Sequence, residues 1–185
     1  MKSKSQFIKS TISIGLVTGL ILLIPFVAMQ FNSEVQWSPF DFMIAGLLIF
    51  GTGLLLLWGM RHGNLLLYRI AIGFSILSVL FMIWANLSIG LVGSGPNIAN
   101  VLYVLTWIIF ISGTFYFQFN PKGMAFTMFA SSFSVCIIAG IALMAGIQHS
   151  PVSSVSEIIG VNGLFAGLLL ISGFLYRMVP ENNVR

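Results

Sequence analysis

Charged side chains are scarce in this sequence, because only 6% of its 185 residues are Asp, Glu, Lys or Arg. Soluble domains carry roughly 25% charged residues, which keep their surfaces in contact with water. Hydrophobic residues make up 58% of the chain. The composition excludes an ordinary water-soluble domain and favours a protein whose surface lies in a lipid bilayer.

Cysteine and histidine are almost absent as well. The single cysteine, Cys136, lies within an apolar run, so neither a disulfide framework nor a cysteine-based metal site is available. The two histidines, His62 and His149, fall on opposite sides of the predicted membrane, which excludes a Ser–His hydrolase pair and a bis-His haem site within one chain. We therefore predict no catalytic residue, no metal site and no cofactor.

Long apolar runs are the dominant feature that is present. A helix needs about 20 apolar residues to cross the hydrocarbon core of a bilayer. The sequence predicts six such spans, at residues 11–31, 42–60, 68–92, 98–117, 124–147 and 158–178. The first follows three lysines as a signal peptide would, but it exceeds the roughly 7–15 residues of a signal core, so we expect a retained helix. The predicted fold is all-α, a single-domain transmembrane bundle of six helices.

The basic residues follow a one-sided pattern along these spans. When loops are assigned to alternating sides, all eight Lys and Arg residues fall on the side of the N-terminus: Lys2, Lys4, Lys9, Arg61, Arg69, Lys122, Arg177 and Arg185. Lys and Arg resist translocation, so the pattern predicts that both termini are cytoplasmic. The basic residues stand singly or in short groups between spans, so no nucleic-acid partner is predicted.

Two spans are preceded by a serine with an acidic residue three positions later. Ser38 and Asp41 precede the second span, and Ser154 and Glu157 precede the sixth. This spacing is typical of a capping box, in which the serine side chain accepts a hydrogen bond from the first helical turn. We expect these four residues to act as helix caps.

Other boundary residues indicate where helices start and stop. Asn120 followed by Pro121 predicts the start of the fifth helix, and Asn64 is expected to cap the third. Gly63 is expected to end the second helix, with the adjacent Arg61 and His62 in its last turn near the negative end of the helix dipole.

No Asp, Glu, Lys, Arg or His occupies the middle of any span, which argues against proton-coupled transport. Four uncharged polar residues are the candidates for intramembrane contacts. Asn86 either forms an interhelical hydrogen bond or contacts a ligand. Thr127, Ser131 and Ser134 share one helix face, which is either a packing surface with hydroxyls bonded to their own backbone or the lining of a solute path.

Small residues recur in three similar stretches, IFGTGL at 49–54, FISGTF at 110–115 and LISGFL at 170–175. The similarity indicates either three related helical hairpins or independent use of small residues where helices approach closely. The Gly15-x-x-x-Gly19 and Gly163-x-x-x-Gly167 motifs are two further candidates for close approach.

Five segments are distinctive: LIPFVAMQF at 23–31, EVQW at 34–37, WANLSIG at 84–90, PKGMA at 121–125 and VNGLF at 161–165. They resemble segments of a group of small, uncharacterised bacterial multi-pass inner-membrane proteins. In that group the loop before the fourth helix carries acidic residues followed by Asn-Pro-Ala-Asn. Here the loop reads GSGPNIAN at 93–100, which lacks the acids. The resemblance implies a bacterial inner membrane location and no particular activity.

Function is predicted only as a ranked set of hypotheses. The first is a non-enzymatic accessory or scaffold protein that works through another membrane protein or through its own oligomer, with the lipid bilayer as its surroundings. The alternative is a small carrier or channel for an uncharged or apolar solute, lined by Asn86, Thr127, Ser131 and Ser134. An intramembrane enzyme acting on a lipid or quinone is a third, less favoured hypothesis.

Overall fold

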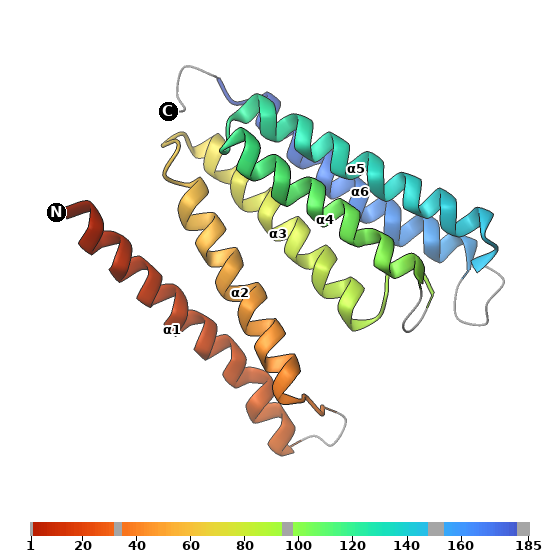
Figure 1. The fold of residues 1–185 in the computed structure, drawn as a ribbon, viewed down its shortest axis with the longest axis horizontal. Helices are drawn as coiled ribbons and strands as arrows, with labels where there is room; N and C mark the ends of the chain where they lie inside the picture. Colours follow the sequence, from red (N-terminus) through yellow and green to blue (C-terminus); the bar gives the residue numbers. More distant parts are fainter. Residues whose placement is uncertain (1, 32–34, 94–97, 148–153, 181–185) are drawn as a thin grey trace. The chain divides into compact units, whose positions relative to one another are not determined.

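The structure is a computed structural model that describes residues 2–31, 35–93, 98–147 and 154–180. These residues form six α-helices, and all six are long and apolar enough to cross a membrane. In chain order they are α1 (Lys2–Phe31), α2 (Pro39–Gly59), α3 (Leu66–Ser88), α4 (Ile98–Phe117), α5 (Pro121–Met144) and α6 (Val155–Arg177) (Figure 1). The predicted all-α fold with six membrane-spanning helices is confirmed, and the architecture is that of a multi-pass membrane protein.

The first helix begins well before the apolar run that predicted it. The helix starts at Lys2, whereas the predicted span starts at Thr11. Hydropathy marks only the part of a helix that suits hydrocarbon, and the helix itself can continue past that part. The Ser10 and Thr11 hydroxyls donate to the backbone carbonyls four residues earlier, at 3.0 and 3.1 Å, so these polar residues are accommodated without interrupting the helix.

Two helices end three or more residues earlier than predicted, because a glycine with positive φ follows each of them. The third was expected to reach Val92, but α3 ends at Ser88 and Gly90 has φ 77°. The fifth was expected to reach Ile147, but α5 ends at Met144 and Gly146 has φ 75°. Glycine adopts this left-handed conformation without steric cost and commonly terminates a helix.

The second helix ends within one residue of its predicted span, but the prediction that Gly63 ends it was wrong. Helix α2 ends at Gly59, and the His62 amide donates to the Gly59 carbonyl at 3.1 Å in the turn that follows. Arg61 and His62 therefore lie beyond the last helical turn. Gly63 is buried against an aromatic ring instead, since a Cβ at this position would lie 2.7 Å from Cδ1 of Tyr68.

The chain divides into two compact units, Met1–Trp58 and Gly59–Arg185. In the first unit, α1 and α2 form an antiparallel hairpin. A Cβ at Gly53 would lie 2.5 Å from Cγ2 of Ile14, and the rings of Phe26 and Phe42 meet edge to face with centroids 6.4 Å apart. This hairpin is joined by close, apolar contacts.

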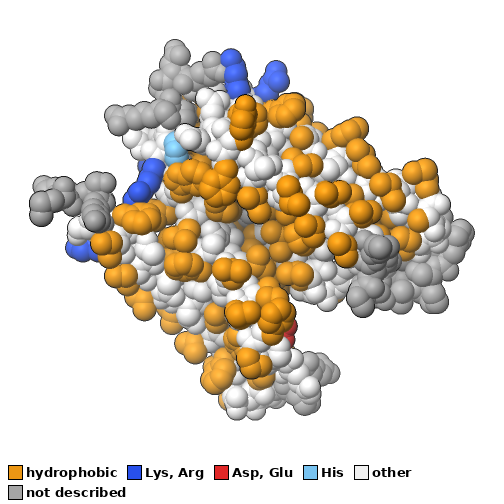
Figure 2. Space-filling model, in the orientation of Figure 1, with side chains coloured by type: hydrophobic (Ala, Val, Ile, Leu, Met, Phe, Trp, Pro, Cys, Tyr) orange, Lys and Arg blue, Asp and Glu red, His pale blue; other side chains and the backbone are white. Residues whose placement is uncertain are grey.

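The second unit is a four-helix bundle made of α3 to α6. Helix α5 packs against both α4 and α6, and α6 packs against α3. Large side chains from different helices, among them Ile72, Met82, Met128 and Leu169, are buried inside it. Figure 2 shows hydrophobic side chains spread over the visible face of the described chain, with the visible Lys and Arg side chains at the margin of that face. This distribution suits a surface covered by lipid.

One glycine of each similar stretch lies where two helices approach closely, whereas a Cβ at Gly51, the other glycine of the first stretch, would meet nothing within 4 Å. Gly53 of α2 meets α1, Gly113 of α4 meets Thr127 of α5, and Gly173 of α6 meets Phe129 of α5, with too little space for a Cβ at any of them. The partner is the preceding helix for α2 and α6 but the following helix for α4. The stretches therefore occupy different structural contexts, which favours independent use of small residues.

The two Gly-x-x-x-Gly motifs do not mark such contacts. A Cβ at Gly15 would lie 3.9 Å from the nearest atom of Phe50, which is ordinary van der Waals contact. At Gly19, Gly163 and Gly167 a Cβ would meet nothing within 4 Å. The spacing alone did not identify the close approaches of this chain.

Gly113→Ala should destabilise the α3–α6 bundle, because the new methyl group would overlap the Thr127 side chain. We expect a loss of about 1–3 kcal/mol, the usual cost of overpacking a tight core. Thermal denaturation of the purified protein in mild detergent measures the effect. Gly163→Ala is the matched control, because its methyl group would meet nothing within 4 Å. Equal melting temperatures for the two variants would contradict the close approach.

Candidate functional site

The acidic residues of the predicted capping boxes lie in the first turns of α2 and α6. The Ser38 amide donates to Asp41 Oδ2 at 2.7 Å, and the Asp41 amide donates to Ser38 Oγ at 3.3 Å, which is the reciprocal pattern of a capping box. At α6, Ser154 Oγ accepts from the Glu157 amide at 3.1 Å. Ser38, Asp41 and Ser154 thus act through their side chains at helix starts, whereas Glu157 takes part through its backbone amide.

The two asparagines expected to cap helices differ in outcome. Asn120 caps α5, because its Oδ1 accepts from the amides of Lys122 at 3.1 Å and Gly123 at 3.5 Å. The prediction for Asn64 was wrong: α3 begins at Leu66, so its N-cap is Leu65 rather than Asn64, and Leu65 makes no side-chain cap bond. Asn64 lies too early to reach the first-turn amides and accepts instead from Arg69 Nη2 at 3.0 Å.

Asn86 lies near the end of α3 and makes an interhelical hydrogen bond. Its Nδ2 donates to the backbone carbonyl of Asn100 in α4 at 3.1 Å. The Asn100 side chain in turn accepts from the amides of Leu91 and Val92 at 2.9 and 3.0 Å. The two asparagines thus hold the α3–α4 connection against the start of α4. The Oδ1 atom of Asn86 is buried and has no hydrogen-bond partner.

The hydroxyl face of α5 lies inside the bundle. Thr127 and Ser131 are 2% and 0% exposed, and Ser134 is half-buried. Thr127 Oγ1 donates to the Gly123 carbonyl at 3.0 Å, and Ser134 Oγ donates to the Ser131 carbonyl at 2.7 Å while lying 2.7 Å from Thr106 Oγ1 of α4. Only Ser131 Oγ lacks a partner. This geometry is that of a packing face.

The four predicted polar residues do not form one site. Asn86 is bonded to Asn100 in the first turn of α4, whereas Thr127 lies against Gly113 in the same helix. Those two positions on α4 are 13 residues apart, which corresponds to about 20 Å along a helix. Asn86 and Thr127 therefore lie near different ends of the bundle.

Sequence reasoning missed the hydrogen bonds that join α6 to α4 and α5. The Tyr103 hydroxyl of α4 donates to Asn162 Oδ1 of α6, and both residues are buried. Ser132 of α5 donates to the Ala166 carbonyl of α6 at 2.8 Å. Asn162, an amide within an apolar span, was a usable signal for an interhelical bond, but nothing in the sequence identifies Tyr103 as its partner.

Two further buried tyrosines connect segments that are distant in sequence. The Tyr176 hydroxyl of α6 lies 3.1 Å from Ser75 Oγ of α3. The Tyr68 hydroxyl donates to the Phe119 carbonyl at 3.1 Å, and this bond ties the start of α3 to the α4–α5 turn. In that turn Gln118 and Phe119 both adopt the left-handed region, with φ 46° and 60°, which is uncommon for residues other than glycine.

The interior of the bundle thus offers amides and hydroxyls that mainly bond to neighbouring helices or to their own backbone. Within the described ranges, no group of three or more His, Cys, Asp or Glu residues is placed to hold a metal ion. Three buried polar atoms in the described chain have no partner: Asn86 Oδ1, Trp107 Nε1 and Ser131 Oγ. The arrangement is suited to holding helices together.

Asn100→Ala should destabilise the bundle, because it leaves the buried amides of Leu91 and Val92 without their acceptor. A buried donor that loses its partner costs about 1–3 kcal/mol. Thermal denaturation in detergent should show a clear fall in melting temperature. Asn64→Ala is the matched control and should change stability by less than about 0.5 kcal/mol, because Asn64 is exposed. A smaller effect for Asn100→Ala than for Asn64→Ala would refute this role.

Comparison with known proteins finds no relative of this chain. No family model matches the chain, no curated protein matches it, and no solved structure matches it. The resemblance to a bacterial membrane-protein group therefore stays a prediction from the sequence. The described chain is that of a six-helix multi-pass membrane protein in which buried polar groups join helices.

Proposed function

We propose that this protein is a non-enzymatic accessory or scaffold protein of the membrane, which acts through another membrane protein or through a second copy of itself. The observation that carries the proposal is the use of the buried polar groups. Tyr103 with Asn162, Tyr176 with Ser75, and Asn86 with the Asn100 carbonyl all join helices of the same bundle. Groups engaged in packing support a structural role better than a chemical one.

The hairpin of α1 and α2 supplies the surface for such a partner. Apolar side chains such as Leu16, Leu20 and Leu47 are exposed on it, and Gly19 and Gly51 have open space around their α-carbons. Transmembrane helices associate through close van der Waals packing, which small residues permit. We assign the partner contact to this hairpin because only 6% of the residues in each of its two spans are buried, against 28–44% in the spans of α3 to α6.

The proposal includes a location. The one-sided distribution of the eight basic residues supports a cytoplasmic position for both termini. The resemblance of segments such as WANLSIG at 84–90 supports a bacterial inner membrane. An even number of spans, as six helices provide, agrees with termini on one side.

Purification in mild detergent at native expression, followed by quantitative mass spectrometry and size measurement, tests the proposed role. We expect a stoichiometric membrane protein or a homo-oligomer. Gly19→Leu should reduce this association, because the side chain would fill open space on α1. Gly160→Leu on α6 is the control with equally open surroundings and should retain the association. A monomer with no partner in the wild type would overturn the proposal.

A carrier for an uncharged solute is the second candidate, and the unpartnered atoms Asn86 Oδ1 and Ser131 Oγ favour it, because a passing solute could bond to them. Glycerol flux into proteoliposomes separates the two functions. Our proposal expects flux no higher than in empty liposomes. Flux that depends on the protein, is lost in Asn86→Leu and is kept in Asn64→Leu would instead establish the carrier.

A further inference from the structure

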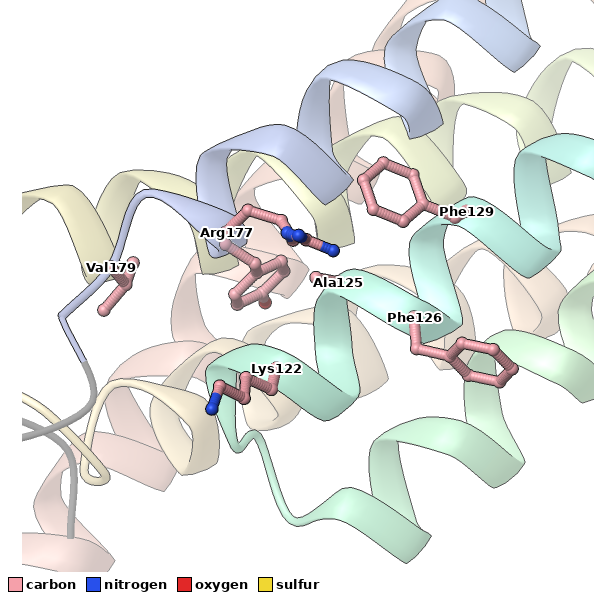
Figure 3. Close-up of a pocket in the computed structure, with 7 residues that line it drawn as sticks. Lys122, Ala125, Phe126, Phe129, Arg177 and Val179 are labelled. Carbon is pink, nitrogen blue, oxygen red and sulfur yellow. The ribbon is translucent and has the colours of Figure 1, made fainter.

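A hollow opens at one end of the α3–α6 unit, between the first turns of α5 and the last turn of α6 (Figure 3). Its volume is about 430 Å³, which falls within the size range of small-molecule sites. Its lining combines two cationic side chains with a group of apolar and aromatic ones. Nothing in the packing role of the bundle accounts for this combination.

The cations come from two different helices. Lys122 lies in the first turn of α5 and Arg177 is the last residue of α6, and the described residues that line the hollow include no carboxylate. Figure 3 shows the Arg177 side chain over the start of α5, whereas the Lys122 side chain points away from Arg177 and must turn toward it to share a ligand. An arginine fork and a lysine ammonium together suit the oxygens of a phosphate group.

The amides at the start of α5 do not contribute to this positive end. Those of Lys122 and Gly123 already donate to Asn120 Oδ1, and that of Met124 donates to the Asn120 carbonyl at 2.8 Å. An anion in the hollow would therefore be held by the Lys122 and Arg177 side chains. The site depends on these two residues rather than on a helix terminus.

The opposite wall of the hollow is apolar and leads to the outer surface of the bundle. The Phe129 ring fills the space that a side chain at Gly173 would need, and it meets Phe174 edge to face with ring centroids 5.3 Å apart. Phe126 is 67% exposed and lies among the residues that the bilayer would cover. A molecule that fits the whole hollow has an anionic end and an apolar chain.

We propose that this hollow binds an anionic phospholipid, with its phosphate between Lys122 and Arg177 and an acyl chain along Phe126. Basic pockets between transmembrane helices at the membrane surface are suited to anionic lipid headgroups. A free phosphate ion would use the cations but not the aromatic wall, so the lipid fits more of the site. This inference goes beyond the proposed function and does not depend on it.

Native mass spectrometry of the full-length protein in detergent, titrated with phosphatidylglycerol or phosphatidylcholine of equal chain length, tests the proposal. The wild type should bind phosphatidylglycerol more tightly, and Lys122→Gln with Arg177→Gln should weaken that binding about 30-fold. This factor equals about 2 kcal/mol at 1.4 kcal/mol per tenfold change, which is the contribution of two basic residues near an anionic surface.

The matched control is Arg61→Gln with Arg69→Gln, which removes two cations that do not line the hollow. These residues flank the α2–α3 connection at the same end of the bundle, since Tyr68 bonds to Phe119 there. The control should retain wild-type binding, and so should Lys122→Arg with Arg177→Lys. Because that charge-preserving swap keeps both cations, its binding supports the site even where the Gln variant is poorly folded.

Three outcomes would overturn the proposal. One is equal affinity of the wild type for the two lipids. Another is an equal loss of binding in the Arg61 and Arg69 variant, which would indicate general charge attraction. The third is full displacement of phosphatidylglycerol by millimolar inorganic phosphate, which would show that the apolar wall contributes nothing and that the ligand is the free ion.

Discussion

Hydrocarbon offers no hydrogen-bond partner, so every polar group that enters it must be satisfied by the chain itself. For the backbone, the six helices provide this satisfaction. For side chains, partners must come from a carbonyl one turn earlier or from a neighbouring helix. Both solutions occur in α5, where Thr127 bonds to its own backbone and Ser132 bonds to the Ala166 carbonyl of α6. The second solution links helices as a direct consequence of the solvent they occupy.

The α3–α6 bundle combines such bonds with close backbone approach. Glycines bring helix surfaces together because a Cβ would not fit between them, as at Gly113 and Gly173. Packing sets the separation of the helices, whereas a directional bond such as that between Tyr103 and Asn162 also sets their register. Interhelical bonds in membrane proteins contribute only about 0.6 kcal/mol on average. Their value here lies in selecting one arrangement among several apolar ones of similar energy.

The sequence was most informative where a structural feature depends on neighbouring residues. Apolar length located all six helices, and the capping position of Asn120 follows from residues within one turn. It was misleading at Asn64, because a shift of one residue in the helix start removes a cap, and tertiary contacts decide such shifts. The sequence did not predict the hydrogen bond between Tyr103 and Asn162, which are 59 positions apart, because no local pattern pairs residues on different helices. Asn86 was identifiable as a bonding group, but its acceptor, a backbone carbonyl, has no sequence signature.

The same constraint places uncharged and charged side chains at different positions along the membrane-spanning helices. In the described spans, uncharged groups occupy the interior and are largely paired, while cations such as Lys122 and Arg177 lie at helix ends, where their charge can reach water or lipid headgroups. Specific recognition of a charged ligand therefore belongs at the bilayer surface in this fold. Recognition of another protein belongs along the apolar helices, where close packing replaces hydrogen bonding. The two proposals concern different surfaces for this physical reason, and neither requires a polar path through the bundle.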